Sequence, residues 1–151
     1  AFAEELYQEV WIKVVNARAE YEPLAKFSTW IFRIAHHRLI DHYRKNAPEI
    51  ATRYEKANSG NDAESEDIIG NQAAPLEQTP QALQERKATA QRIDQALAEL
   101  PAPQREAFLL AEEGGLTLEE IAAATASSRE TSKSRLRYAL GKLRHSLQDL
   151  L

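Results

Sequence analysis

Apolar residues recur at helical spacing along most of the chain, and the alternation typical of strands is absent. Between residues 3 and 15, Leu6, Val10 and Val14 recur every fourth residue while polar side chains occupy the other faces. A second helix is predicted to begin near Ser28. One side of that helix carries Phe27, Ile31, Ile34, Ala35, Leu39 and Tyr43.

The C-terminal half has clearer helix boundaries. A third apolar period ends at Pro101, and residues 104–113 form a short helix that Gly114-Gly115 closes. Thr117 and Glu120 fit a capping box, as do Ser127 and Glu130, so each pair is predicted to open a further helix. The third period consists of Leu83, Ala90, Ile93, Leu97 and Leu100.

Two capped helices separated by a short turn predict a helix-turn-helix unit. On a wheel of the last helix, one flank of the apolar stripe carries cations, while Arg135 and Lys142 lie elsewhere. A solvated basic face is the simpler interpretation, but the two capping boxes favour DNA binding. The stripe is Leu136, Leu140, Leu143 and Leu147, and the flanking cations are Arg129, Lys133, Arg137 and Arg144.

Apolar periodicity stops once, in the middle of the chain. Residues 48–80 contain seven acidic and two basic side chains, several Pro and Gly residues, and few large apolar ones. This composition predicts an acidic flexible linker. We therefore expect an all-α protein of two small helical modules, at residues 1–47 and 81–151, joined by that linker.

Charge and composition narrow the function further. The 151 residues carry a net charge of -4, but residues 127–151 hold six basic and two acidic groups, so the last helix is locally cationic. No apolar run approaches the length of a membrane span, and no signal-peptide core opens the chain. The absence of cysteine excludes disulfides and thiolate metal sites.

Catalytic and metal chemistry find little support. No nucleophile with a neighbouring base and no phosphate-binding Gly-rich loop occurs. Four residues could suggest a metal site, but a zinc site needs three or four convergent ligands, and two of the four point elsewhere on a helical wheel. They are His36, His37, Asp41 and His42. We expect no cofactor, no metal and no enzyme.

Several segments, in order along the chain, together resemble extracytoplasmic-function (ECF) sigma factors of the bacterial sigma-70 family. Residues 4–15 resemble the core-binding helix of region 2, and residues 27–45 (FSTWIFRIAHHRLIDHYRK) resemble its promoter-melting and minus-ten helix. Residues 100–110, 115–122 and 133–136 resemble region 4, which reads the minus-thirty-five element.

This resemblance implies a cytoplasmic initiation subunit that binds core RNA polymerase and promoter DNA, with an anti-sigma factor as a further partner. It places the polymerase contact at Glu5, Leu6, Gln8, Glu9, Trp11, Ile12 and Lys13. It places minus-ten contacts at Lys26, Phe27, Trp30, Arg33, His37, Arg38, Asp41, Arg44 and Lys45. Minus-thirty-five contacts fall at Ser128, Arg129, Lys133, Ser134, Arg137 and Arg144.

The chain departs from the family pattern in places. Family members usually have Gly between two apolar residues in the turn of the helix-turn-helix, where this chain has Thr125, Ala126 and Ser127, and Ser132 replaces a β-branched apolar residue. We therefore expect loose packing at the turn. His37 stands where many members have Asn, so base preference does not carry over. The chain starts inside a helix at Ala1, so we also expect that the first helix of region 2 precedes it.

Other interpretations stay open from the sequence. Trp30 is either a core aromatic or a side chain beside melted DNA, and Trp11 is either a core residue or a surface anchor. The helix face that carries Glu5 and Glu9 is either simply solvated or a contact with polymerase. A helix-turn-helix regulator with an unrelated helical sensor is the first alternative function. A sigma-like protein that sequesters regulators is the second.

Overall fold

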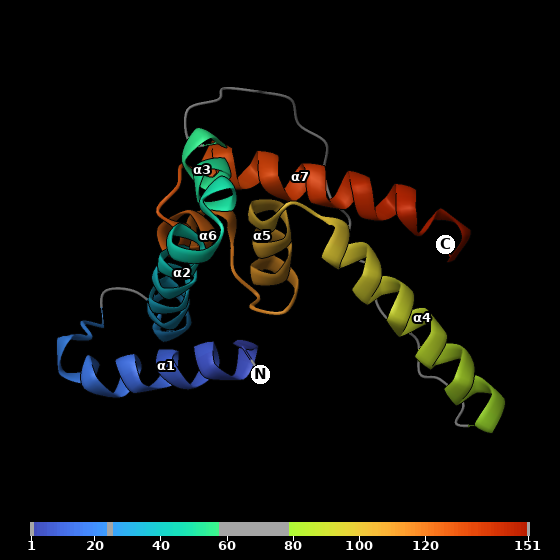
Figure 1. Cartoon of the computed structure of the whole chain (residues 1–151), viewed down its shortest axis with the longest axis horizontal. Helices are drawn as coiled ribbons and strands as arrows, with labels where there is room; N and C mark the ends of the chain where they lie inside the picture. Colours follow the sequence, from blue (N-terminus) through green and yellow to red (C-terminus); the bar gives the residue numbers. More distant parts are fainter. Residues whose placement is uncertain (1, 24–25, 58–78, 151) are drawn as a thin grey trace.

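The structure is a computed structural model in which residues 2–23, 26–57 and 79–150 are described. These residues form α-helices and two 3₁₀ turns with no strand, as predicted (Figure 1). The helices are α1 Phe2–Asn16, α2 Phe27–Asn46, α3 Pro48–Ala57, α4 Pro80–Glu99, α5 Ala102–Glu112, α6 Leu118–Thr125 and α7 Arg129–Ser146. The 3₁₀ turns are Arg18–Glu20 and Gln148–Leu150.

The two predicted capping boxes have different outcomes. At the start of α6, the Thr117 hydroxyl accepts a hydrogen bond from the Glu120 amide while the Glu120 carboxylate accepts one from the Thr117 amide, as predicted. The predicted box at Ser127 is wrong, because Ser128 is the residue that caps α7, accepting from the Thr131 amide at 3.0 Å. Ser127 faces the buried turn instead.

The glycine pair after α5 ends that helix as predicted. Gly115 has a φ of 63°, a left-handed conformation that favours glycine. A Cβ on Gly114 would lie 2.6 Å from the Leu110 carbonyl oxygen, so only glycine fits there. The turn lets the Leu116 amide donate to that same carbonyl and brings the Leu116 side chain into the core.

The C-terminal helices α4 to α7 are built on two apolar clusters. One joins α4 to α7 and is formed by Ala96, Leu100, Ala139 and Leu143. The other joins α5 to α6 and is formed by Leu110, Leu116, Ile121 and Ala124. Beyond the first cluster, α4 projects away from the rest of the protein (Figure 1).

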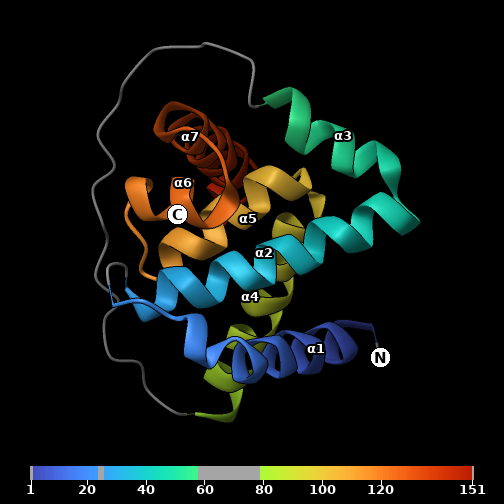
Figure 2. The same ribbon diagram turned by 90° about the vertical axis from the view of Figure 1, so that its left-hand side faces the viewer.

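Helix α2 lies between α1 and the C-terminal helices (Figure 2). Phe32 packs against the cluster formed by α5 and α6, and Ile40 shares a cluster with Tyr54 of α3 and Ala102 of α5. The two helical modules therefore pack directly on each other.

Residues 48–57 correct the linker prediction, because they form a docked helix. Ala51 and Tyr54 of α3 are each 5% exposed. The segment is acidic overall, but it forms an amphipathic helix whose apolar side packs against α2 and α5. The rest of the predicted linker, residues 58–78, lies outside the described residues. No helix in the described part of the chain is long and apolar enough to cross a membrane.

Candidate nucleic-acid and polymerase interfaces

The outer face of α7 carries the cations predicted to bind DNA. Arg144 is exposed, and Lys133, Ser134 and Arg137 are partly exposed. The guanidinium of Arg137 lies 5.1 Å from the centroid of the Tyr138 ring. The opposite face packs into the protein and carries Thr131, Ser132, Arg135, Ala139 and Leu143. The helix thus has one face for its own core and one for a ligand, which a recognition helix needs.

Arg135 lies away from the other cations of α7, as the helical wheel predicted. The wheel placed it off the DNA-binding face, and the structure shows that it is 5% exposed and lies in the buried face. Desolvation lowers its pKa, although Glu106 and Tyr54 act in the opposite direction. Leu136 and Leu140 of the predicted stripe are only partly buried.

Arg129, at the start of α7, is held by carboxylates of the same module. Its Nε donates to Glu119 at 2.6 Å, and Nη1 lies 3.6 Å from Glu130. The hydrogen bond lowers the pKa of Glu119 and raises that of Arg129. Both partners are exposed, so water and salt screen this pair. The N-cap Ser128 is exposed beside it.

Along α2, four predicted minus-ten residues share one exposed side. They are Arg33, His37, Asp41 and Arg44. Arg44 lies 3.6 Å from Asp41 and 3.9 Å from Glu55, so this face already contains charge pairs. Lys45 is exposed at the end of the helix.

The pKa of His37 is affected both by partial burial and by neighbouring positive groups. Its pKa is lowered, first by burial and then by His36 and Arg33, while Asp41 opposes the shift. The imidazole is therefore mainly neutral at pH 7, a form in which one ring nitrogen donates and the other accepts hydrogen bonds.

An aromatic group marks the start of α2. The Tyr21 ring contacts Phe27 and Trp30, with centroids 5.5 and 5.1 Å away, and Phe27 and Trp30 lie 5.7 Å apart. Phe27 is 50% exposed and Trp30 is partly buried. Trp30 therefore packs in an aromatic cluster and is still partly exposed, and the exposed edge of that cluster is Phe27.

Helix α1 presents the predicted polymerase face to solvent. Trp11 is 43% and Ile12 is 59% exposed, so Trp11 is a surface residue. Leu6 is half-buried, and the exposed remainder comprises Glu5, Gln8, Glu9 and Lys13. Glu9 forms an ion pair with Arg38 of α2, which lowers the Glu9 pKa and raises that of Arg38. The sequence assigned these two residues to separate sites, and the structure joins them.

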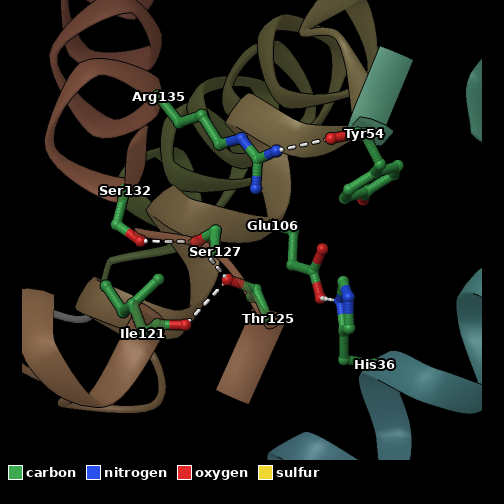
Figure 3. A network of polar contacts seen from close by, with 8 residues as sticks. All are labelled: His36, Tyr54, Glu106, Ile121, Thr125, Ser127, Ser132 and Arg135. Carbon is green, nitrogen blue, oxygen red and sulfur yellow. Dashed lines mark hydrogen bonds and ion pairs between the residues drawn. The ribbon is translucent and has the colours of Figure 1, made fainter. Parts of the chain in front are cut away.

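The junction between the modules contains polar contacts that sequence reasoning missed (Figure 3). His36 of α2 and Glu106 of α5 approach to 2.6 Å between Nδ1 and Oε1, and both are largely buried. Arg135 of α7 donates to the Tyr54 carbonyl of α3 at 3.2 Å. The four residues come from four different helices. Isolated polar residues on apolar helix faces were the available sequence signal.

Hydroxyl groups replace apolar packing in the turn before α7 (Figure 3). Thr125 donates to the Ile121 carbonyl at 2.8 Å and lies 2.9 Å from the Ser127 hydroxyl, which lies 3.0 Å from that of Ser132. Ser132 is fully buried and Thr125 is 5% exposed. The expectation of loose packing is therefore wrong, because a continuous series of hydrogen bonds links the residues of the turn to Ser132 of α7.

The four residues of the conceivable metal site diverge. His36 pairs with Glu106, while the His42 ring lies 4.0 Å from that of Phe2 and 2.9 Å from the Asn46 amide nitrogen. Within the described ranges, no group of three or more His, Cys, Asp or Glu could hold a metal ion.

Comparison with known proteins matches both halves of the chain. The family description Sigma-70 region 2 matches residues 1–49, and Sigma-70, region 4 matches residues 90–143. The ECF RNA polymerase sigma factor RpoE of Cereibacter sphaeroides is 34% identical over 147 residues, covering 96% of this chain and 72% of the relative. The chain belongs to the ECF sigma factors. Members of this family are non-enzymatic transcription factors.

Further ECF sigma factors show the same likeness. SigK of Mycobacterium ulcerans is 32% identical over 153 residues, covering 97% of this chain and 72% of the relative. A solved structure of the sigma factor RpoE in complex with the anti-sigma factor NepR from Bartonella quintana superposes with a TM-score of 0.66. That pair is 27% identical and covers 97% of this chain and 81% of the other. The likeness therefore extends to the fold.

Proposed function

We propose that this ECF sigma factor binds core RNA polymerase in the cytoplasm and directs promoter-specific initiation through two DNA-reading helices. One observation carries the proposal. The chain places two sigma regions in order, and each presents its own candidate nucleic-acid face, on α2 and on α7. A single-site repressor needs only one of these faces.

Helix α7 is proposed to hold the minus-thirty-five element. Its cations lie on the side opposite the buried face, so the helix can enter a groove while its apolar side stays packed. The proposed contacts to phosphates and base edges come from Ser128, Arg129, Lys133, Ser134, Arg137 and Arg144.

Helix α2 is proposed to bind the melted minus-ten strand. Unstacked bases bind on aromatic surfaces beside cationic groups. The exposed Phe27 edge supplies the aromatic surface, and Arg33, about one turn after Trp30 of the same aromatic group, supplies the cation. Neutral His37 would contribute hydrogen bonds. The remaining proposed contacts are Lys26, Trp30, Arg38, Asp41, Arg44 and Lys45.

Helix α1 is proposed to dock on polymerase. Trp11 and Ile12 form an exposed apolar pair bordered by charged residues, which suits an interface with an apolar centre and a polar rim. The proposed polymerase contacts also include Glu5, Leu6, Gln8, Glu9 and Lys13. By likeness to the NepR-bound sigma factor, we infer that an anti-sigma factor controls this protein.

Transcription of sheared genomic DNA with purified core polymerase tests the proposal. Adding the protein should produce transcripts whose mapped 5′ ends share two upstream elements. A variant combining Lys133→Ala and Arg137→Ala should lose these transcripts and keep its affinity for polymerase. Binding of specific DNA by the protein alone, with no polymerase-dependent transcripts, would contradict the proposal and indicate a helix-turn-helix regulator.

A further inference from the structure

Helix α3 occupies an unexpected place for a segment whose composition is that of a linker. It begins two residues after α2 ends and packs against α2 and α5. Figure 2 shows it beside the end of α2, close to the N-terminal part of α7. It therefore follows region 2 in the sequence, since the region 2 match ends at residue 49, and it touches region 4 in space.

Tyr54 makes most of these contacts. Its ring stacks on Tyr43 of α2 at 6.2 Å and meets His36 edge-on at 5.7 Å, and it shares a cluster with Ala102 of α5. The Arg135 guanidinium of α7 lies 5.5 Å from the ring centroid and donates to the Tyr54 carbonyl. One residue of the chain between the modules thus holds three helices together.

Two carboxylates of region 4 extend the contact along α2. Glu120 of α6 accepts from the Thr29 hydroxyl at 3.2 Å and from the Lys26 ammonium at 3.4 Å. Glu106 of α5 pairs with His36. Lys26 is a proposed minus-ten contact, so a region 4 carboxylate occupies the position that a phosphate of the promoter would take.

This closed arrangement cannot read a whole promoter. Elements centred at minus ten and minus thirty-five lie about 25 base pairs apart, or about 85 Å along B-form DNA. In the structure α2 contacts α6, which packs on α7, and each of these helices is at most 20 residues, or about 30 Å, long. Region 4 must leave α2 before both elements can be bound.

We propose that α3 is a self-inhibitory clasp, which holds regions 2 and 4 in a closed resting state through Tyr54 and must leave region 4 before initiation. This inference rests on the proposed sigma function. Release also lengthens the connection, because ten residues span about 15 Å as a helix and about 34 Å when extended. The clasp needs no second protein.

Breaking the clasp is the first test. Tyr54→Ala removes the ring, and with it the ring contacts to α2, α5 and α7, while the backbone carbonyl that accepts from Arg135 remains. Glu55→Ala, on the exposed side of the same helix, is the matched control. The natural chain has no cysteine, so Asn16→Cys and Lys142→Cys allow dye labelling of the two modules. In Tyr54→Ala we expect lower energy transfer and at least tenfold faster tryptic cleavage at Lys56. Glu55→Ala should match the unmodified protein.

The same variants are then assayed at the promoter identified by the transcription experiment above, with limiting sigma protein. Tyr54→Ala should form at least threefold more open complex, because a larger fraction of molecules is competent to bind. Unchanged energy transfer would show that α3 is not the clasp. An opened protein with equal or lower open-complex yield would show that closure does not inhibit.

Locking the closed state is the second test, and it does not depend on how Tyr54→Ala folds. Oxidation joins Thr29→Cys to Glu120→Cys by a disulfide across the junction, where the native side-chain oxygens lie 3.2 Å apart and Thr29 is buried. The locked protein should keep polymerase binding, lose at least tenfold in open-complex formation and recover when the disulfide is reduced. Full activity while locked would overturn the proposal. Absence of promoter-dependent transcription by the unmodified protein would instead refute the sigma function itself.

Discussion

Several cations that the sequence offers to DNA are held by carboxylates of the same chain. Lys26 is paired with Glu120, Arg38 with Glu9, and Arg129 with Glu119. These pairs are exposed at one or both partners, so they stabilise the fold only slightly. The pairs hold the cationic side chains in place, and a competing phosphate would lose little free energy in displacing the carboxylate.

The outer face of α7 gives a prediction at single-residue scale. Replacing Lys133 or Arg137 with Ala in the polymerase-bound protein should lower the slope of log affinity against log salt for the upstream element by about 0.9 per lost phosphate contact. Filter binding across a salt series measures this slope. Lys142→Ala, exposed on another side of the helix, is the control. Arg135 does not suit that purpose because it is buried. Equal losses of polymerase and promoter affinity would make α7 a protein-binding surface.

His37 gives a pH prediction. An NMR titration should place its pKa below that of a histidine in an unfolded chain, since burial and positive neighbours oppose its charge. The unfolded state then binds the proton first, so the free energy of unfolding should fall as pH drops from about 6.5 toward the folded pKa. His37→Gln should lose this pH dependence. A raised pKa would mean that Asp41 dominates, and that the minus-ten face carries an additional cation.

At the scale of elements, the turn before α7 and helix α3 show how local sequence can mislead in opposite directions. Departures from the family pattern in the turn and at Ser132 of α7 suggested loose packing, yet the hydroxyls of Thr125, Ser127 and Ser132 each have a hydrogen-bond partner. The acidic stretch after α2 suggested a coil, yet its first ten residues contain apolar side chains at helical spacing, and they dock. In both cases the partners lie on neighbouring elements.

Ala126 gives a prediction for the turn. It ends α6 in the left-handed region, with a φ of 50°. This conformation raises the free energy of a residue with a Cβ by about 1–2 kcal/mol and that of glycine by little. Ala126→Gly should raise the free energy of unfolding by about 0.5–1 kcal/mol, after the entropy that glycine adds to the unfolded chain is subtracted. Ala123→Gly, on the exposed side of α6, should lower it by about 1 kcal/mol. Urea unfolding compares the two, and equal destabilisation would contradict the argument.

At the scale of the whole molecule, closure and charge act together on DNA binding. The chain is net acidic, its candidate DNA contacts are divided between two modules, and the modules are packed too closely to span a promoter. The closed protein can therefore use one module at a time, with only a few phosphate contacts.

We therefore expect the free protein to bind promoter duplex near the non-specific range, with a Kd of about 10⁻⁴ to 10⁻⁶ M at physiological salt. Docking on polymerase fixes the separation of the modules and makes the second contact intramolecular, which raises avidity by about 10² to 10⁴. Titration of fluorescent promoter duplex with and without core polymerase measures both values. Tight sequence-specific binding without polymerase would rule out this dependence.

Local sequence patterns were enough to predict the helical fold class, the Thr117 capping box, the glycine end of α5 and the cationic face of the last helix. These features depend on residues within a few positions of one another, so a local pattern suffices. The burial of Arg135, the docking of residues 48–57 and the packing of α2 against α6 depend on contacts between distant parts of the chain, which the folded structure reveals. An apolar or polar side chain at helical spacing looks the same whether it faces its own module or another one. Contacts such as His36 with Glu106 join residues 70 positions apart, and no local period records them.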